Sequence, residues 1–347
     1  MKKIVECVPN FSEGRDLQVI EAITAEIGAV EGVKLLGADA DKDYNRTVVT
    51  FVGQPQAVVE AAFAATRKAA QLIDMTQHKG EHPRFGATDV VPFVPVSGVT
   101  MEECVQLANE YGRRVGEELG IPVYLYEEAA TRPERRNLAK VRKGEYEGLA
   151  EKMKDAQWKP DYGPETFNAK SGATIAGARV FLIAYNVNLD SNEVHSAQII
   201  AQNIRESGRV LKDQKGQTVR DKAGKAKRVP GTLKAVKGMG VLLEEHDIAQ
   251  VSMNLVNYKI TPPHVAFEEV KKEGAKLGVG VTGSEIVGVT PLEALLMAAR
   301  HHLGSQGKSA DLSERELVAE AVDYLGLSDL QPFDPDQKII EFQIGAR

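Results

Sequence analysis

The segment HKGEHPRFG, residues 78–86, gathers ionisable side chains at a density that suggests chemistry. It holds His78, Glu81 and His82, with Lys79 and Arg84 beside them. The sequence pattern His78-x-x-Glu81-His82 matches an inverted zinc-peptidase motif, in which two histidines bind one metal ion. The same side chains could instead form a metal-free acid and base site. The conformation of the backbone decides between the two.

A zinc site of this kind requires both histidines on one face of a helix. Pro83 disfavours helical geometry at His82, and Gly80 weakens any helix around it. On an extended chain, residues 78 and 82 lie about 13 Å apart, which is too far for one ion. The sequence therefore favours an exposed loop without a metal over a zinc peptidase.

A histidine in such a loop can accept and return a proton near neutral pH, which suits a reaction with both steps. Arg84 and Lys79 could hold carboxylates, Arg84 through its two-pronged guanidinium. Surface charge alone would explain any one of these residues. Two further polar stretches, 10–14 and 39–46, lie at the ends of other expected strands, so we predict one polar site built from the three segments.

Hydrophobic periodicity indicates the regular elements that position these segments. In the first half, strands are expected at 3–9, 33–40, 46–53, 89–96 and 122–126, and helices at 16–28, 54–74 and 100–119. The second half repeats the order, with strands at 179–189, 233–243, 249–258 and 279–289, helices at 193–206 and 264–277, and a further helix opened by Pro291.

Two successive βαββαβ units fit this order better than one doubly wound parallel sheet. The predicted fold class is α/β (α+β), with two ferredoxin-like subdomains over residues 1–178 and 179–347. Each subdomain is expected to have a mixed or antiparallel sheet with helices on its outer face, and a ligand cleft is expected between them. The segment 158–172, dense in Pro, Gly and polar residues, is the expected seam.

Composition narrows the class of protein. A chain of 347 residues with 43% hydrophobic and 27% charged residues predicts a globular protein of about two domains. Since no run approaches about 18 apolar residues, neither a membrane span nor a signal peptide is expected. Two cysteines, Cys7 and Cys104, argue against a disulfide scaffold and favour the cytoplasm. A net charge of −6 gives no reason to expect nucleic acid.

The charge is distributed unevenly along the chain. Between residues 209 and 228, eight Lys or Arg stand against Asp213 and Asp221, a local charge of +6. Because the whole chain carries −6, the remainder carries −12. This basic stretch is either a solvated loop or a collar for a polyanionic small molecule.

Several long motifs, in order along essentially the whole chain, resemble the glutamate formimidoyltransferases of histidine breakdown, also called formiminotransferases. The resemblance covers the transferase domain, without the cyclodeaminase domain of the fused animal members. The motifs are VECVPNFSEG (5–14), NRTVVTFVG (45–53), DMTQHKGEHPRFGATDVVPFVPV (74–96), IPVYLYEEAA (121–130), GATIAGARVFLIAYNVNL (172–189), AQVSMNLVNY (249–258) and PFDPDQKIIEF (332–342).

The resemblance implies transfer of the formimidoyl group from N-formimidoyl-L-glutamate to N5 of tetrahydrofolate, giving 5-formimidoyltetrahydrofolate and glutamate. It also implies a homodimer that uses tetrahydrofolate, polyglutamylated forms included, as co-substrate without a metal. The family's catalytic histidine falls on His82. Its folate-contacting segments fall on residues 163–172 and 231–240, and the folate candidates are Gly163, Pro164, Gly172, Gly231, Lys234, Lys237, Gly238 and Gly240.

In the mechanism that this suggests, His82 accepts the proton that N5 loses and returns it to the departing glutamate nitrogen. Asp39 either stabilises the cationic amidine or caps a strand end. Arg46 and Arg84 are candidates for holding the glutamate carboxylates, and Asn10 completes the substrate-binding candidates. His78 is expected either to be structural or to support a residue that acts on the substrate. Two alternatives stay open: transfer of a formyl group between 5-formyltetrahydrofolate and glutamate, and non-catalytic folate binding.

Overall fold

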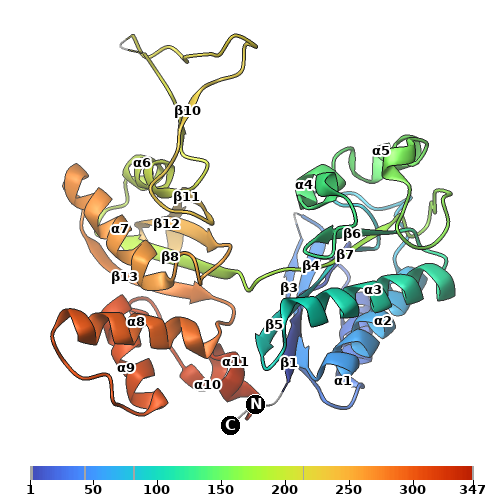
Figure 1. The fold of residues 1–347 in the computed structure, drawn as a ribbon, viewed down its shortest axis with the longest axis horizontal. Helices are drawn as coiled ribbons and strands as arrows, with labels where there is room; N and C mark the ends of the chain where they lie inside the picture. The colour runs from blue at the N-terminus through green and yellow to red at the C-terminus, as the bar shows by residue number, and fades with distance from the viewer. Residues whose placement is uncertain (1–2, 43, 81–82, 214, 346–347) are drawn as a thin grey trace. The chain divides into compact units, whose positions relative to one another are not determined.

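The computed structural model describes residues 3–42, 44–80, 83–213 and 215–345. The chain divides into two compact units, unit 1 (Met1–Val180) and unit 2 (Phe181–Arg347), as Figure 1 shows. The predicted catalytic residue His82, together with Glu81, lies outside the described residues.

Unit 1 is built on a βαββαβ unit. Its four strands pair antiparallel in the order β5-β1-β4-β3, so that β1 and β4 occupy the centre. This is the ferredoxin-like order, and it confirms the architecture expected for the first half. The elements are β1 (Ile4–Cys7), α1 (Leu17–Gly28), β3 (Val33–Asp41), β4 (Arg46–Gly53), α2 (Pro55–Leu72) and β5 (Thr88–Ser97).

Three further strands enlarge this sheet. The two-residue strand β2 (Asn10–Phe11) lies between β4 and β5. Beyond β5, strands β7 (Thr174–Ala178) and β6 (Val123–Glu127) continue the sheet in parallel pairings, which makes the sheet mixed. The segment 158–172 was wrongly expected to be the seam between domains. It belongs to unit 1, where Asp161 N donates to Val123 O at 2.8 Å.

The two faces of the unit 1 sheet are covered differently. Helices α1, α2 and α3 (Met101–Glu118) pack on one face, and the apolar side chains of this core include Ile23, Val58 and Leu107. On the other face, the β5-β7-β6 part is covered by the short helices α4 (Leu138–Val141) and α5 (Glu145–Lys152), which are flanked by the 3-10 turns η1 (Pro133–Arg135) and η2 (Ala156–Trp158).

Unit 2 repeats the βαββαβ order. Its sheet is antiparallel in the order β11-β12-β8-β13, which confirms the predicted internal repetition. The elements are β8 (Ile183–Leu189), α6 (Val194–Ile204), β11 (Val236–Leu243), η3 (Glu244–His246), β12 (Ile248–Leu255), α7 (Pro263–Leu277) and β13 (Val281–Val287), followed by α8 (Leu292–Ser305), α9 (Glu314–Leu325), α10 (Pro335–Lys338) and α11 (Ile340–Gln343).

The basic stretch forms a narrow arm between α6 and β11, drawn in yellow-green in Figure 1. At its base, β9 (Arg209–Val210) pairs with β10 (Arg228–Val229). Towards the tip, the Oδ1 atom of Asp213 accepts from Lys215 N and Gln217 N at 2.8 and 2.9 Å. In a second turn, the Oδ1 atom of Asp221 likewise accepts from Ala223 N and Lys225 N, both at 2.9 Å. In its described residues the arm is therefore a double turn, and the carboxylates of Asp213 and Asp221 both accept hydrogen bonds from the backbone.

Two further observations bear on the composition. Cys7 and Cys104 are buried free thiols, and burial raises the pKa of Cys104 to about 12. Within the described ranges, no helix has the length and apolarity needed to cross a bilayer.

Candidate functional site

Asn45 joins the three polar segments that were predicted to form one site. Its Oδ1 atom accepts a hydrogen bond from Gly14 N at 2.9 Å, and its Nδ2 atom donates to Lys79 O at 3.0 Å. The backbone oxygen of Asn45 is 2.9 Å from His78 Nε2. Asn45 adopts φ 48°, a left-handed conformation that asparagine tolerates better than most residues. The structure therefore brings the described parts of the segments 10–14, 39–46 and 78–86 together.

Two glycines make this convergence possible. A Cβ atom on Gly14 would lie 2.1 Å from Asp41 O, and a Cβ atom on Gly80 would lie 2.2 Å from Tyr44 O. Both distances are far below van der Waals contact, so a larger residue would push the loops apart. Glycine is needed at both positions because two backbones touch there.

His78 is fixed by bonds to both of its ring nitrogens. Arg84 donates from Nε to His78 Nδ1 at 3.2 Å, so the ring hydrogen sits on Nε2 and is donated to Asn45 O. Burial lowers the pKa of His78, and the charge of Arg84 acts in the same direction. His78 is thus a neutral structural residue in this arrangement, with no lone pair left for a substrate proton or a metal ion.

Arg84 is buried and engaged by carboxylates of its own chain. Its Nη1 atom donates to Glu147 at 2.8 Å and to Glu145 at 3.4 Å. Burial lowers the pKa of Arg84, but the hydrogen bonds and charges of Glu147 and Glu145 outweigh burial and raise it. The predicted contact between Arg84 and a substrate carboxylate would require Glu147 to move away. In the described structure Arg84 instead orients His78.

Three of the predicted substrate-binding residues lie on one face of the unit 1 sheet. Asn10 and Asp39 both pair with Val48 from opposite sides, and Arg46 lies two residues before Val48 on the same strand. Because side chains alternate along a strand, Asn10, Asp39 and Arg46 share the face opposite α1. Phe11 is on the core side.

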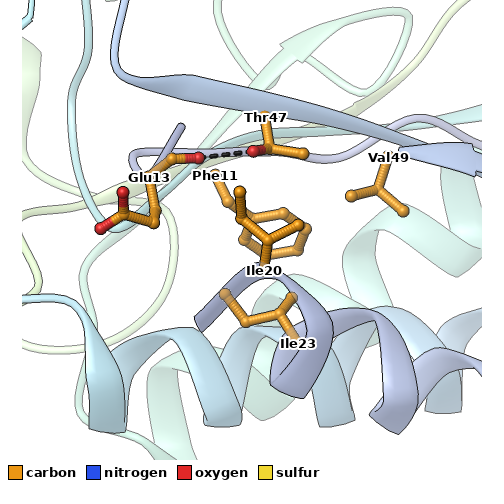
Figure 2. A pocket seen from close by; sticks show the side chains of 6 residues that line it. All are labelled: Phe11, Glu13, Ile20, Ile23, Thr47 and Val49. Atoms are coloured by element: carbon orange, nitrogen blue, oxygen red, sulfur yellow. Dashed lines mark hydrogen bonds between the residues drawn. The ribbon is translucent and has the colours of Figure 1, made fainter. Parts of the chain in front are cut away.

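A small hollow lies on the core side of the same strands (Figure 2). It has no interior room even for a water molecule, whereas ordinary ligand pockets measure roughly 300–1,000 Å³. At its rim Thr47 Oγ1 donates to Glu13 O, which fixes the backbone of the loop 10–14. The hollow is therefore part of the support of the loop rather than a substrate site. Its lining consists of Phe11, Glu13, Ile20, Ile23, Thr47 and Val49.

Asp89 and Arg142 belong to the site but were not singled out from the sequence. Asp89 is only 1% exposed. Its Oδ1 accepts from Phe85 N at 2.9 Å and its Oδ2 accepts from Arg142 Nη2 at 2.6 Å. Burial raises the pKa of Asp89, while the charges of Arg142 and Arg46 oppose that rise. An aspartate at the start of the apolar strand DVVPFV was the available signal, since such a residue needs a partner when buried.

The first predicted folate segment ends against the loop that follows His82. Gly172, at φ 67°, pairs with Gly86, and Ala173 N donates to Phe85 O at 3.1 Å. A Cβ atom on Gly172 would lie 2.4 Å from Phe85 O. At the other end, Gly163 precedes Pro164 and lies against the turn before β6, where a Cβ atom would be 2.6 Å from Ile121 O. The folate contacts of this segment stay a prediction.

The second predicted folate segment lies on and before β11 in unit 2. Its glycines permit close approach of α6: a Cβ atom would lie 2.0 Å from Arg205 O at Gly231 and 2.3 Å from Gln198 N at Gly240. The oxygen of Gly238 accepts from Arg205 Nη1 at 3.1 Å. The remaining two candidates, Lys234 and Lys237, are exposed cations. The glycines therefore have a packing role, and the folate contacts of Lys234 and Lys237 stay a prediction.

Comparison with known proteins places this geometry in a family. Residues 4–179 match the N-terminal subdomain of the formiminotransferase domain, and residues 184–345 match the formiminotransferase domain. The chain belongs to the formiminotransferase family. This confirms the resemblance drawn from the motifs. The two formiminotransferase matches also meet close to the division between unit 1 and unit 2.

Relatives of this formiminotransferase fall into two groups by length. The mouse formimidoyltransferase-cyclodeaminase is 50% identical over 344 residues, which are 99% of this chain and 60% of the mouse protein. The glutamate formimidoyltransferase of Streptococcus pyogenes serotype M1 is 46% identical over 87% of this chain and 94% of its own length. The glutamate formimidoyltransferase of Thermoplasma acidophilum is 46% identical over 92% of this chain and 98% of its own length. The chain thus spans about three fifths of its bifunctional relatives and nearly all of the two prokaryotic ones.

Proposed function

We propose that this formiminotransferase transfers the formimidoyl group of N-formimidoyl-L-glutamate to N5 of tetrahydrofolate, in the degradation of histidine to glutamate. The observation that carries the proposal is the convergence of three polar loops of unit 1 around Asn45, at the segment that bears the predicted catalytic histidine. The nearly full-length similarity to two proteins named glutamate formimidoyltransferase supports it.

His82 is the proposed proton carrier. Tetrahydrofolate supplies the nucleophilic nitrogen N5. The imidazole of His82 takes up the proton that is lost at N5 and releases it to the nitrogen of the departing glutamate, which contributes about 10²- to 10⁴-fold to the rate. Holding the two substrates in line supplies the larger share. His78, with both ring nitrogens engaged, leaves this role to His82.

The other residues of the site are assigned by their charge and position. Asp39 is exposed on the sheet face shared with Asn10 and Arg46, where its carboxylate can stabilise a cationic amidine. Arg46 is the proposed partner of a glutamate carboxylate. In unit 2, the exposed ammonium groups of Lys234 and Lys237 suit the glutamyl carboxylates of a folate.

The direct test is an assay of the purified protein with formimidoylglutamate and tetrahydrofolate, followed by acid conversion of the product to the light-absorbing methenyl form. We expect turnover that depends on both substrates. The formyl alternative is tested in parallel with 5-formyltetrahydrofolate and glutamate. Faster reaction with that pair would show that the formyl donor, not formimidoylglutamate, is the substrate. Folate binding without either reaction would show that the protein binds folate but is not a transferase.

We further propose that the enzyme acts as a cytoplasmic homodimer and needs no metal. Light scattering on a sizing column should give twice the mass of the chain. Activity should survive dialysis against a chelator, and elemental analysis should find no stoichiometric zinc. Bound zinc whose removal abolishes turnover would instead favour the metal interpretation of His78-x-x-Glu81-His82.

A further inference from the structure

The four-stranded sheet of unit 2, seen in Figure 1, carries a row of side chains that crosses all of its strands. On β11, a Cβ atom on Gly240 would touch α6, so Met239 beside it lies on the face that points away from α6. The register places one residue of each other strand in the same row: Ser252 on β12, Asn186 on β8 and Glu285 on β13. Met239 is 55% exposed and the other three are partly exposed, so the row is open to solvent.

The carboxylate of this row has hydrogen-bond partners at only one of its oxygens. Glu285 Oε1 accepts from Asn186 Nδ2 at 2.9 Å and from Gln250 Nε2 at 3.0 Å. Among the described residues, no hydrogen bond reaches Glu285 Oε2 and no basic side chain pairs with this carboxylate. Carboxylates that are partly removed from water normally have such partners. Glu285 Oε2 is therefore an acceptor that a ligand can use.

Asn186 offers a second acceptor on the neighbouring strand. Because its amide nitrogen donates to Glu285, the orientation of the amide is fixed, and no donor within the described ranges reaches Asn186 Oδ1. Gln250, which is 2% exposed, holds the arrangement in place, since its Nε2 atom donates to Asn188 Oδ1 at 2.8 Å as well as to Glu285. The row thus presents two acceptors on adjacent strands, supported by buried amides.

Two neighbouring acceptors match a ligand edge that has two neighbouring N–H donors. The pterin ring of tetrahydrofolate has such an edge, formed by its 2-amino group and N3–H. An apolar contact for a flat ring is also present, because Val287 is the next residue of β13 on this face and is 53% exposed. A few convergent polar groups beside apolar side chains are typical of small-molecule sites.

The opposite edge of the same face is positively charged. Lys237 lies on β11, two residues before Met239 and therefore on the same face, and its side chain is exposed. Among the described residues, no carboxylate pairs with Lys237. In the strand order β11-β12-β8-β13, three strand spacings separate Lys237 from Glu285, which is about 14 Å. The p-aminobenzoylglutamate part of an extended folate can bridge this distance.

We propose that this face binds tetrahydrofolate across the strands, with the 2-amino group and N3–H of the pterin on Glu285 and Asn186 and the glutamate end on Lys237. This rests on the proposed function and adds a pterin site to the folate contacts predicted for β11. The charges fix the direction of the molecule, since Lys237 attracts the glutamate carboxylates and Glu285 repels them.

The first test is Glu285→Gln, which keeps the shape of the side chain and removes its charge. We expect the Kd for 5-formyltetrahydrofolate and for 6-methyltetrahydropterin, measured by calorimetry, to rise about tenfold, because a hydrogen bond to a charged acceptor is lost. The Kd for p-aminobenzoyl-L-glutamate, which lacks the pterin, should stay within about twofold. The matched control is Glu245→Gln in the exposed turn η3, which should bind all three ligands as the wild type does. Unchanged pterin binding by Glu285→Gln, or an equal loss for all three ligands, would overturn the proposal.

The second test is Lys237→Gln, for which the opposite ligand preference is expected. The Kd for p-aminobenzoyl-L-glutamate and for 5-formyltetrahydrofolate should rise several-fold, and more at low salt, while the Kd for 6-methyltetrahydropterin stays within about twofold. Because Lys237 is exposed, this variant keeps its fold even if Glu285→Gln is destabilised. Weaker binding of the pterin alone, or an unchanged Kd for the glutamate-bearing ligands, would show that the folate does not lie in this direction.

The wild type separates failure of this site from failure of the proposed function. If the wild type transfers the formimidoyl group and Glu285→Gln still binds the pterin normally, the site is wrong and the function stands. If the wild type neither binds 5-formyltetrahydrofolate nor catalyses the transfer, the proposed function and the site both fail.

Discussion

His78 and Asn45 are joined by a hydrogen bond of 2.9 Å from the imidazole Nε2 to the backbone oxygen. With Arg84 bound to the opposite ring nitrogen, this bond makes His78 a link between two loops. We therefore expect separate roles for His78 and His82, and variants at each can distinguish structure from chemistry.

Replacing His82 by alanine should leave folate binding intact and abolish most of the transfer. We expect kcat to fall by about 10²- to 10⁴-fold, since a positioned acid and base is lost while the binding groups remain. Titration with 5-formyltetrahydrofolate checks the binding, and the coupled methenyl assay checks the rate. Turnover equal to that of the wild type would refute the assignment of His82.

Replacing His78 by alanine should act mainly on stability. Two hydrogen bonds disappear, and the buried partners at Arg84 Nε and Asn45 O lose theirs, which costs about 2–4 kcal/mol in total. Urea unfolding should show this loss. The folded fraction should keep more activity than the His82 variant does. If His78→Ala instead folds as well as the wild type but is fully inactive, His78 is the better candidate for the proton carrier.

Gly80→Ala should displace the loop 78–80 from the turn before β4. The new Cβ atom would meet Tyr44 O at 2.2 Å, so the backbones must separate by more than an ångström. We expect a loss of about 1–3 kcal/mol in unfolding free energy and a raised KM for formimidoylglutamate. The matched control is Gly148→Ala in α5, where nothing lies within 4 Å of the new Cβ and alanine favours the helix. Equal behaviour of the two variants would contradict the close contact.

His264 should make unit 2 sensitive to acid. Burial lowers its pKa to about 4, its stacked neighbour His301 adds to the effect, and Glu268 opposes it. The imidazole takes up a proton near pH 6.5 in the unfolded chain but only near pH 4 in the folded one. The contribution of His264 to the free energy of unfolding is therefore complete above pH 6.5 and is lost as pH falls towards 4. The loss amounts to roughly 3 kcal/mol. Between pH 4 and 7, the unfolding free energy measured with urea should change more steeply with pH for the wild type than for His264→Phe. Parallel curves for the two proteins would exclude the effect.

The basic arm should select anionic tails. Replacing Lys212, Lys215, Lys222 and Lys225 by serine removes exposed cations and leaves the turn-forming aspartates in place. We expect the KM for polyglutamylated tetrahydrofolate to rise several-fold, and more than that for the monoglutamate. Shortening residues 210–228 should act in the same direction. An equal effect on the KM of both folates would show that the arm does not recognise the polyglutamate tail and is a solvated loop.

The sequence predicts the local elements well because they rest on local patterns. The strand at 46–53 was expected with the bounds that β4 has, since β-branched residues alternate there between core and solvent. By contrast β7 was missed as a separate strand. Its residues Thr174–Ala178 are mostly small, and it is a strand because β5 and β6 flank it in parallel.

The candidate site is predictable only in outline. The three polar segments follow from composition, but the bonds that arrange them are made between distant parts of the chain. Arg142 reaches Asp89 across 53 residues, and Asn45 reaches Lys79 across 34. No spacing rule reveals such partners, so the roles of Asn45, Asp89 and Arg142 become visible only when the sheet is formed.

The arm between Gly208 and Gly231 is made of two copies of one turn, centred on Asp213 and Asp221. The base of the arm is held by hydrogen bonds that do not involve its tip: Arg205 and Arg228 both donate to the backbone oxygen of Gly208. A whole turn can therefore be gained or lost as a module without disturbing the attachment. The reach of the positive charge can thus be changed in this chain while the βαββαβ body stays the same.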